Sequence, residues 1–265
     1  MTDVADRARA LLGDLWDDDV AAAVARYPQS SAAVVGLLAA PAASIEDGLV
    51  AESLVYADLQ SGPEFAVWLA ERGPATPVPS LDPVRLERSG DELTITLHRP
   101  QCHNAVDVAM RDALVEAFAL VAADPTLTAT LQGDGPSFCS GGDLREFGTS
   151  PDPATAHAVR VERLPARALA TVADRLTARV HGYCVGAGAE LAAICHRVIA
   201  APATTFRLPE VAMGLVPGQG GTVSLPRRIG AARTAWLALS GTAIDVQTAL
   251  VWGLVDEIEA GPPSD

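Results

Sequence analysis

The spacing of apolar residues changes near residue 80, and the change predicts a different kind of structure on each side. Before it, apolar residues recur at intervals of three and four, as in the run with Ile45, Leu49 and Val55, which is typical of amphipathic helices. This spacing predicts short helices over 4–15, 20–26, 31–38, 45–59 and 64–72. Repeated prolines from Pro74 to Pro83 predict a stiff link. We therefore expect an N-terminal helical extension over residues 1–80.

From residue 84 onward the pattern alternates between strands and helices. Residues 85–98 are typical of a β-hairpin around Ser89, Gly90 and Asp91. Further strands are expected over 127–132, 178–181 and 198–201, and helices over 105–122, 154–173, 187–195, 220–229, 232–240 and 246–252. Such alternation predicts a layered α/β core, here over residues 84–265.

Charge and composition exclude several classes of function. The 265 residues carry a net charge of −14, which disfavours binding to nucleic acid or to an anionic membrane surface. All 19 basic residues are arginine, so chemistry that needs a lysine Schiff base is excluded. The four cysteines have no CxxC spacing, and we expect no metal site. The N-terminus lacks the basic start and apolar run of a signal peptide, so we expect a cytoplasmic protein.

Three segments combine glycines with acidic residues: 137–144, 181–191 and 208–221. Glycine at a strand-to-helix turn lets the backbone approach a ligand closely, and free N–H groups at a helix start attract negative charge. Two such turns can direct two N–H groups at one oxygen and stabilise an oxyanion that develops from a carbonyl. Glu190 and Glu210 lie near these turns in the sequence and can move protons.

Each of these features also has an ordinary structural interpretation. A glycine-rich turn is usually only a turn, and Asp143 can cap a following helix. Glu190 can be a first-turn carboxylate favoured by the helix dipole, and Glu210 can be a solvated loop residue. The dinucleotide-binding motif GxGxxG is not satisfied, because the sequence at 186–191 is GAGAEL.

The order and spacing of four blocks nevertheless resemble the crotonase family, also called the enoyl-CoA hydratase/isomerase superfamily. The blocks are RPQCHNA at 99–105, FCSGGDL at 138–144, GAGAEL at 186–191 and LPEVAMGLVPGQGG at 208–221. The segments LSGT at 239–242 and GLVD at 253–256 are similar to the later helical region and final strand of that family. The resemblance extends from about residue 84 to residue 258.

The resemblance implies a crotonase-like spiral of β-β-α units that binds an acyl-CoA thioester and needs no cofactor, since coenzyme A is part of the substrate. It implies that the amides of Gly142 and Ala187 bind the thioester oxygen, and that Glu190 and Glu210 add or remove water. It also implies a homo-oligomer, either a trimer or a hexamer. The positions that match substrate-binding or CoA-binding residues of the family are Arg99, Cys102, His103, Asn104, Cys139, Ser140, Gly141, Asp143, Gly186 and Gly218.

Two departures from the family pattern modify these expectations. The sequence ends soon after the final strand, so we expect a shortened C-terminal helical region, with the N-terminal helices occupying part of its space. The lysines that commonly bind phosphate are absent, and arginine can replace them. Arg99 and Arg145 are the candidates, and the alternative for each is an ordinary surface charge.

Both glutamates of true hydratases are present, which favours an enoyl-CoA hydratase-like lyase of class EC 4.2.1. Other chemistry of the family is an alternative: isomerisation, dioxygenation, decarboxylation or thioester hydrolysis. The N-terminal helices are similar to those of a cofactor-free dioxygenase branch, but that branch lacks the glutamate pair. A further alternative is a non-catalytic partner subunit that keeps the fold and binds CoA weakly.

Overall fold

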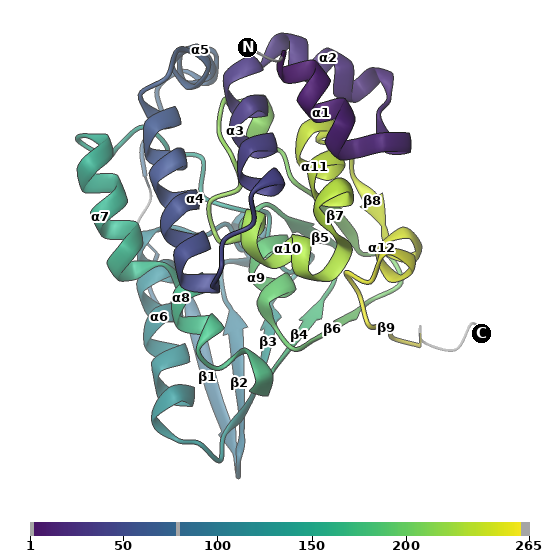
Figure 1. Cartoon of the computed structure of the whole chain (residues 1–265). Helices are drawn as coiled ribbons and strands as arrows, with labels where there is room; N and C mark the ends of the chain where they lie inside the picture. Colours follow the sequence, from purple (N-terminus) through teal and green to yellow (C-terminus); the bar gives the residue numbers. More distant parts are fainter. Residues whose placement is uncertain (1–2, 78–79, 261–265) are drawn as a thin grey trace.

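The structure is a computed structural model and describes residues 3–77 and 80–260. The N-terminal part consists of helices, purple to blue in Figure 1: α1 Val4–Leu12, α2 Asp18–Arg26, α3 Pro28–Ala39, α4 Ile45–Gln60 and α5 Pro63–Arg72. Capping side chains explain where α2 and α4 begin, because Asp17 and Ser44 accept hydrogen bonds from the amides of Val20 and Asp47. The predicted helices are therefore present. Residues 78–79 of the predicted link lie outside the described residues.

The remaining chain contains a six-stranded sheet, in the order β1-β2-β3-β4-β6-β9. Its strands are β1 Val84–Ser89, β2 Glu92–Leu97, β3 Thr128–Gly133, β4 Leu176–Val180, β6 Arg197–Ala200 and β9 Glu257–Ile258. β1 and β2 form the predicted antiparallel hairpin, and the other neighbours are parallel. Parallel neighbours need crossover segments, which the helices between them supply. The predicted α/β class is confirmed.

A smaller sheet has the order β5-β7-β8, and the sequence pattern does not predict it. Its strands are β5 Tyr183–Val185, β7 Thr205–Arg207 and β8 Ile244–Asp245. Strands of this length are too short to show a clear alternation of apolar and polar residues. Beyond the β5–β7 pair, the Gly186 amide donates to the Arg207 carbonyl (2.9 Å), and this bond fixes the turn that leads into the next helix.

The core helices follow the predicted pattern with one exception. They are α6 Val108–Ala123, α7 Pro153–Arg163, α8 Pro165–Ala170, α9 Ala187–Ile194, α10 Gly221–Ile229, α11 Ala231–Ser240 and α12 Val246–Trp252. The prediction of one helix over 154–173 is wrong. Leu164 is extended (φ −74°, ψ 117°) because the ring of Pro165 disfavours helical geometry in the residue before it. The chain therefore breaks into α7 and α8.

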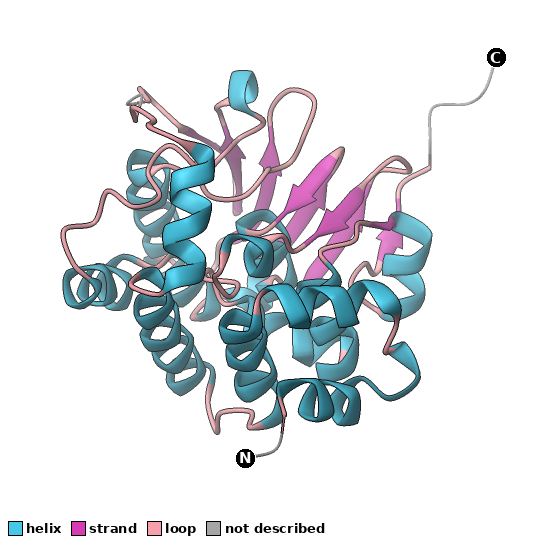
Figure 2. Ribbon diagram, turned by 90° about the horizontal axis from the view of Figure 1, so that it is seen from above, coloured by secondary structure: helices cyan, strands magenta, loops and turns pink. Residues whose placement is uncertain are grey.

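The strands gather on one side of the molecule and the helices on the other, as Figure 2 shows. The N-terminal helices pack on core helices: α4 contacts α7 and α10, while α1, α2 and α3 contact α11. Buried apolar residues form one cluster that includes Ala8 and Phe65 of the N-terminal helices and Leu254 near the last strand. No helix within the described ranges is long and apolar enough to cross a membrane.

Candidate active site

Two glycine-containing turns lie against each other. One follows β5, and the other follows the segment at Cys139. The Cys139 amide donates to the Tyr183 carbonyl (3.0 Å), and the Val185 amide donates to the Cys139 carbonyl (2.9 Å). The turns contain Gly141 (φ 103°) and Gly186 (φ 51°), whose conformations favour glycine. A Cβ atom on Gly186 would lie 3.5 Å from the Cα atom of Gly141, so the two turns are in close contact.

The residues that follow these turns, Gly142 and Ala187, line one cavity of about 150 Å³. Ala187 is the first residue of α9, so its amide has no acceptor within the helix. Around Gly142 the chain is bonded to Val106 through the Gly141 carbonyl (2.8 Å) and the Asp143 amide (2.9 Å). Among residues 3–77 and 80–260, the Gly142 and Ala187 amides have no protein acceptor. The cavity is therefore lined by two residues whose N–H groups donate to no other described residue.

Glu190 lies in the first turn of α9, is 1% exposed and lines the same cavity. Its Oε2 atom accepts hydrogen bonds from the amides of Gln219 (2.6 Å) and Gly221 (2.7 Å). Burial raises the pKa of this carboxyl group well above its ordinary value, and the neighbouring Glu210 and Glu52 raise it further. The site therefore favours retention of a proton among the carboxyl groups of Glu190, Glu210 and Glu52.

Glu210 begins the short helix η4 Glu210–Met213 and also lines the cavity. It is 9% exposed, so the alternative that it is a solvated loop residue is wrong. Its Oε2 atom is buried and has no hydrogen-bond partner in the described part of the chain. Burial raises its pKa to about 8, which keeps it mostly protonated at neutral pH. A Cβ atom on Gly186 would lie 2.5 Å from its Oε1 atom, so this carboxyl group leaves no room for a side chain there.

Tyr56 of α4 and Arg160 of α7 line the same cavity, and neither was predicted from the sequence. The Arg160 guanidinium carbon lies 3.6 Å from the centroid of the Tyr56 ring, and its Nη1 atom donates to the Gly218 carbonyl (2.8 Å). A neighbouring cavity of about 330 Å³ shares this pair and is lined by α7 and by the segment at 146–151. The wall of the site therefore includes an N-terminal helix.

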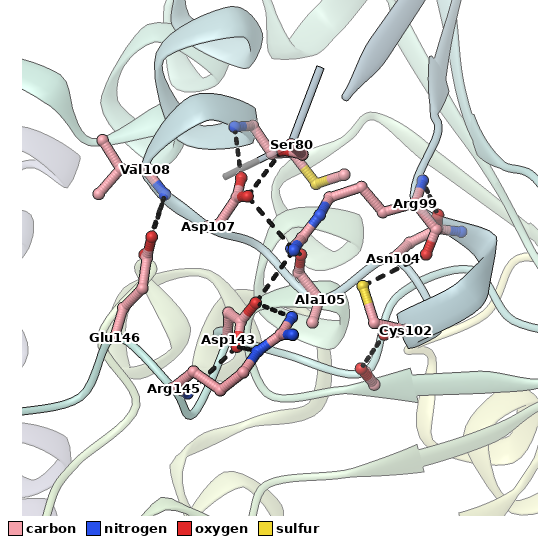
Figure 3. A network of polar contacts seen from close by, with 12 residues as sticks. Ser80, Arg99, Cys102, Asn104, Ala105, Asp107, Val108, Asp143, Arg145 and Glu146 are labelled. Atoms are coloured by element: carbon pink, nitrogen blue, oxygen red, sulfur yellow. Dashed lines mark hydrogen bonds and ion pairs between the residues drawn. The ribbon is translucent and has the colours of Figure 1, made fainter. Parts of the chain in front are cut away.

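A buried ion network holds the segments beside the cavity together (Figure 3). Arg99 is 2% exposed, pairs with Asp143 (3.1 Å) and Asp107 (3.3 Å), and donates to the Ala105 carbonyl. Asp143 also pairs with Arg145 (2.6 Å). Arg99 is therefore neither a surface charge nor free to bind a CoA phosphate, and Asp143 pairs with arginines instead of capping a helix. A sequence pattern alone does not distinguish an arginine in a buried ion pair from one at the surface.

The other positions that match CoA-binding residues divide into buried and accessible ones. Asn104 is buried, and its side chain bonds three backbone groups, so it ties the surrounding loops together. Cys139 is buried as well, and burial raises the pKa of its thiol to about 12. Gly218 lines the cavity itself. The positions with remaining exposure are Cys102, His103 and Ser140.

Tyr56 and Arg160 lie outside the four sequence blocks, so no motif indicates them. A tyrosine on the apolar face of a helix usually indicates a core residue, and an arginine on an exposed helix usually indicates a surface charge. One signal was available. Glu52 is an acidic residue on the helix face that Leu49 and Tyr56 share, and an acid in that position needs a partner when it is buried.

Comparison with known proteins identifies the family. A family model described as enoyl-CoA hydratase/isomerase matches residues 88–261. The chain belongs to the enoyl-CoA hydratase/isomerase family. The part that matches the enoyl-CoA hydratase/isomerase family carries both turns and both glutamates, whereas helices α1–α5 precede it.

Similar members of the enoyl-CoA hydratase/isomerase family include hydratases and an isomerase. The chain is 36% identical over 167 residues to 2,3-dehydroadipyl-CoA hydratase of Escherichia coli, which covers 63% of this chain and 65% of that protein. It is 36% identical over 171 residues to 1,2-epoxyphenylacetyl-CoA isomerase of the same species, with the same coverage of 63% and 65%. A crystal structure of enoyl-CoA hydratase from Thermoplasma volcanium has a TM-score of 0.61 at 33% identity, covering 67% of this chain and 71% of that one. The chain thus spans less than two thirds of the length of these two curated relatives.

Proposed function

We propose that the chain hydrates 2-enoyl thioesters of coenzyme A and, in reverse, dehydrates 3-hydroxyacyl thioesters. One observation carries the proposal: two residues with free amides and two buried glutamates line a single cavity. Chemistry of the enoyl-CoA hydratase/isomerase type on an acyl-CoA is supported by the family match and by relatives whose names are those of hydratases acting on CoA thioesters.

In the proposed reaction, the amides of Gly142 and Ala187 donate to the thioester carbonyl oxygen. Water adds through its oxygen to C3, and the electron pair of the C2–C3 double bond moves toward the thioester, which becomes an enolate. The two amides stabilise the negative charge on the enolate oxygen. The proton that water loses goes to one glutamate, and the proton that C2 gains comes from the other. One water molecule is thereby added, and no redox partner is needed.

We assign the base to Glu190 and the acid to Glu210. The Glu190 carboxyl group accepts two hydrogen bonds from amides of the 219–222 turn, and these bonds favour its ionised form against burial, which raises its pKa. The Glu210 carboxyl group has a buried oxygen without a partner among the described residues, and its pKa is raised to about 8 by burial. Glu210 therefore carries a proton to give at neutral pH, and the two amide donors distinguish Glu190 as the group whose ionised form the site can hold.

Coenzyme A contacts are proposed for the accessible residues of the first and second blocks. Cys102, His103 and Ser140 keep some exposure, and they are joined by hydrogen bonds from the Ser140 amide to the His103 carbonyl (2.9 Å) and from the Ser140 hydroxyl to the Cys102 carbonyl (3.4 Å). Arg145 follows Ser140 by five residues and is partly exposed; its Nε and Nη2 atoms donate to Asp143, and its Nη1 atom is proposed to donate to a phosphate.

Ultraviolet absorbance of the conjugated thioester tests this function. With crotonyl-CoA and longer 2-enoyl-CoA substrates, we expect the absorbance to fall and mass spectrometry to show a product heavier by one water. A rise in absorbance from a 3-enoyl-CoA, without hydration of the 2-enoyl substrate, would instead establish isomerase chemistry. No change with either substrate, together with measurable CoA binding, would support the non-catalytic alternative.

The hydration rate is expected to fall at alkaline pH. Glu210 must be protonated to donate to C2, and its pKa is raised to about 8 by burial, so the active form is lost as pH rises through that value. The kcat for crotonyl-CoA should decrease by about tenfold per pH unit above about pH 8. Circular dichroism over the same range provides the control for unfolding. A kcat that continues to rise through pH 9 would contradict the assignment of Glu210 as the acid.

A further inference from the structure

Glu52 of α4 is a third buried glutamate beside the candidate site, and the proposed reaction gives it no role. It is 1% exposed. Its Oε1 atom accepts from the Gly220 amide (2.7 Å), and its Oε2 atom accepts from the amide (2.8 Å) and the hydroxyl (2.6 Å) of Thr222. An N-terminal helix is therefore bonded through a carboxyl group to the start of α10.

Glu52 and Glu190 bind alternate amides of one turn, residues 219–222. Glu190 binds the amides of residues 219 and 221, and Glu52 binds those of residues 220 and 222. Because α10 begins at Gly221, the amides of its first residues have no acceptor within the helix. The Glu190 and Glu52 carboxyl groups supply acceptors for the amides of Gly221 and Thr222. A displacement of the turn away from Glu52 would also move the donors that hold Glu190.

We propose that Glu52 is a positioning residue for the hydration reaction: it fixes the 219–222 turn, and the turn fixes the Glu190 carboxylate. This inference rests on the proposed function of Glu190. The turn contains two consecutive glycines, whose backbone is conformationally permissive, so an acceptor from another element limits its freedom. The N-terminal helices thus complete the site as well as cover it.

The charge of Glu52 also bears on the two proposed catalytic groups. Burial raises the pKa of Glu52 to about 7, so Glu52 is negative above that pH. Its charge raises the pKa values of Glu190 and Glu210. The other charged or titratable groups near it are Arg160 of α7, Tyr56 of α4, and His157 of α7, which bonds the adjacent Ser53. Glutamine at position 52 removes the negative charge, and the pKa of Glu210 should then fall.

A role confined to stability predicts a different result from a positioning role. If Glu52 only ties α4 to α10, its replacement lowers the melting temperature and leaves kcat of the folded protein unchanged. If it positions Glu190, kcat falls in the folded protein and the pH profile moves.

The test compares Glu52→Gln with the wild-type chain in crotonyl-CoA hydration. We expect kcat to fall by about 10- to 100-fold, because a small misplacement of a catalytic base is costly, with KM changed by less than about twofold. The alkaline limb of kcat should move to lower pH. Hydrogen exchange at residues 219 and 221 should quicken even though their acceptor, Glu190, is unchanged.

Asp17→Asn is the matched control. Asp17 is also a carboxylate of the N-terminal helices, and it accepts from the Val20 amide (2.8 Å) and from Trp236 Nε1 of α11 (2.6 Å), without lining the candidate site. Its replacement should lower stability and leave kcat, the pH profile and exchange at 219 and 221 unchanged.

A milder pair of variants covers the case in which Glu52→Gln fails to fold. Thr222→Val removes only the hydroxyl donor to Glu52, and Thr222→Ser retains it. We expect a severalfold lower kcat for the valine variant and rescue by serine. Unchanged kcat, pH profile and exchange in folded Glu52→Gln or Thr222→Val would overturn the positioning role. An inactive wild-type chain would instead overturn the proposed function, and the exchange measurement alone would then decide whether Glu52 fixes the turn.

Discussion

Glu190→Gln and Glu210→Gln are each expected to lower kcat for crotonyl-CoA by about 10²–10⁴-fold, the usual contribution of a positioned acid or base. Glutamine nearly preserves the volume of each side chain but neither accepts nor releases the required proton. Both residues line the cavity that Gly142 and Ala187 also line, so each substitution removes one proposed proton transfer and leaves the proposed carbonyl contacts in place. Steady-state absorbance measurements on both variants check this result.

Unfolding measurements distinguish the loss of a proton-transfer group from the loss of folded structure. The pKa of Glu210 is raised from 4.5 to about 8 in the folded chain, so its contribution to stability is full below about pH 4.5 and is lost as pH rises toward 8. Glu210→Gln should therefore flatten the decline of unfolding free energy between these values. Substantial hydration by folded Glu210→Gln would refute the two-glutamate mechanism and favour one-acid chemistry such as isomerisation.

Ala187→Pro is expected to lower kcat by about 10²–10³-fold, the cost of removing one donor from an oxyanion site. Proline has no N–H group, so the substitution deletes the amide proposed to bind the thioester oxygen. Ala187 is the first residue of α9, a position where proline is well tolerated, and Gly186 before it has the freedom to adapt. The same hydration assay measures the loss, and circular dichroism measures whether α9 and the fold persist.

Ala231→Pro supplies the matched control for this substitution. Ala231 is the first residue of α11 and also follows a glycine with positive φ, Gly230 at 81°. It does not line the cavity that contains the glutamates. We expect the Ala231→Pro variant to retain the kcat of the unmodified chain in the hydration assay. An equal loss of rate in both proline variants would show that helix disruption, and not the missing donor, explains the effect.

The sequence predicts most of this fold because the main helices and strands are long enough to show a periodic spacing of apolar residues. The hairpin at β1 and β2 and the N-terminal helices follow directly from apolar spacing. The three-residue strands β5 and β7 are too short for such a signal. The break at Leu164 was predictable from Pro165, whose ring restricts the preceding residue.

The candidate site is predictable only where its residues belong to a local motif. Gly142, Ala187, Glu190 and Glu210 all occur in glycine-containing blocks, and the structure brings them to one cavity. Tyr56 reaches that cavity from α4, which precedes all four of these residues in the sequence, through helix packing that no local pattern encodes. For Arg99 the error is the opposite one. It lies in a motif that predicts CoA binding, yet its guanidinium group forms buried ion pairs with Asp107 and Asp143.

The alternating bonds of the 219–222 turn have a consequence for the order in which the candidate site forms during synthesis. One acceptor comes from residue 52, and the amides it meets are made 168 and 170 residues later. A nascent chain that has already formed α4 therefore carries the Glu52 carboxyl group without its donors until the 219–222 turn emerges. Onset of the proposed hydration activity during refolding would then report the contact between α4 and the start of α10, later than the appearance of helical signal.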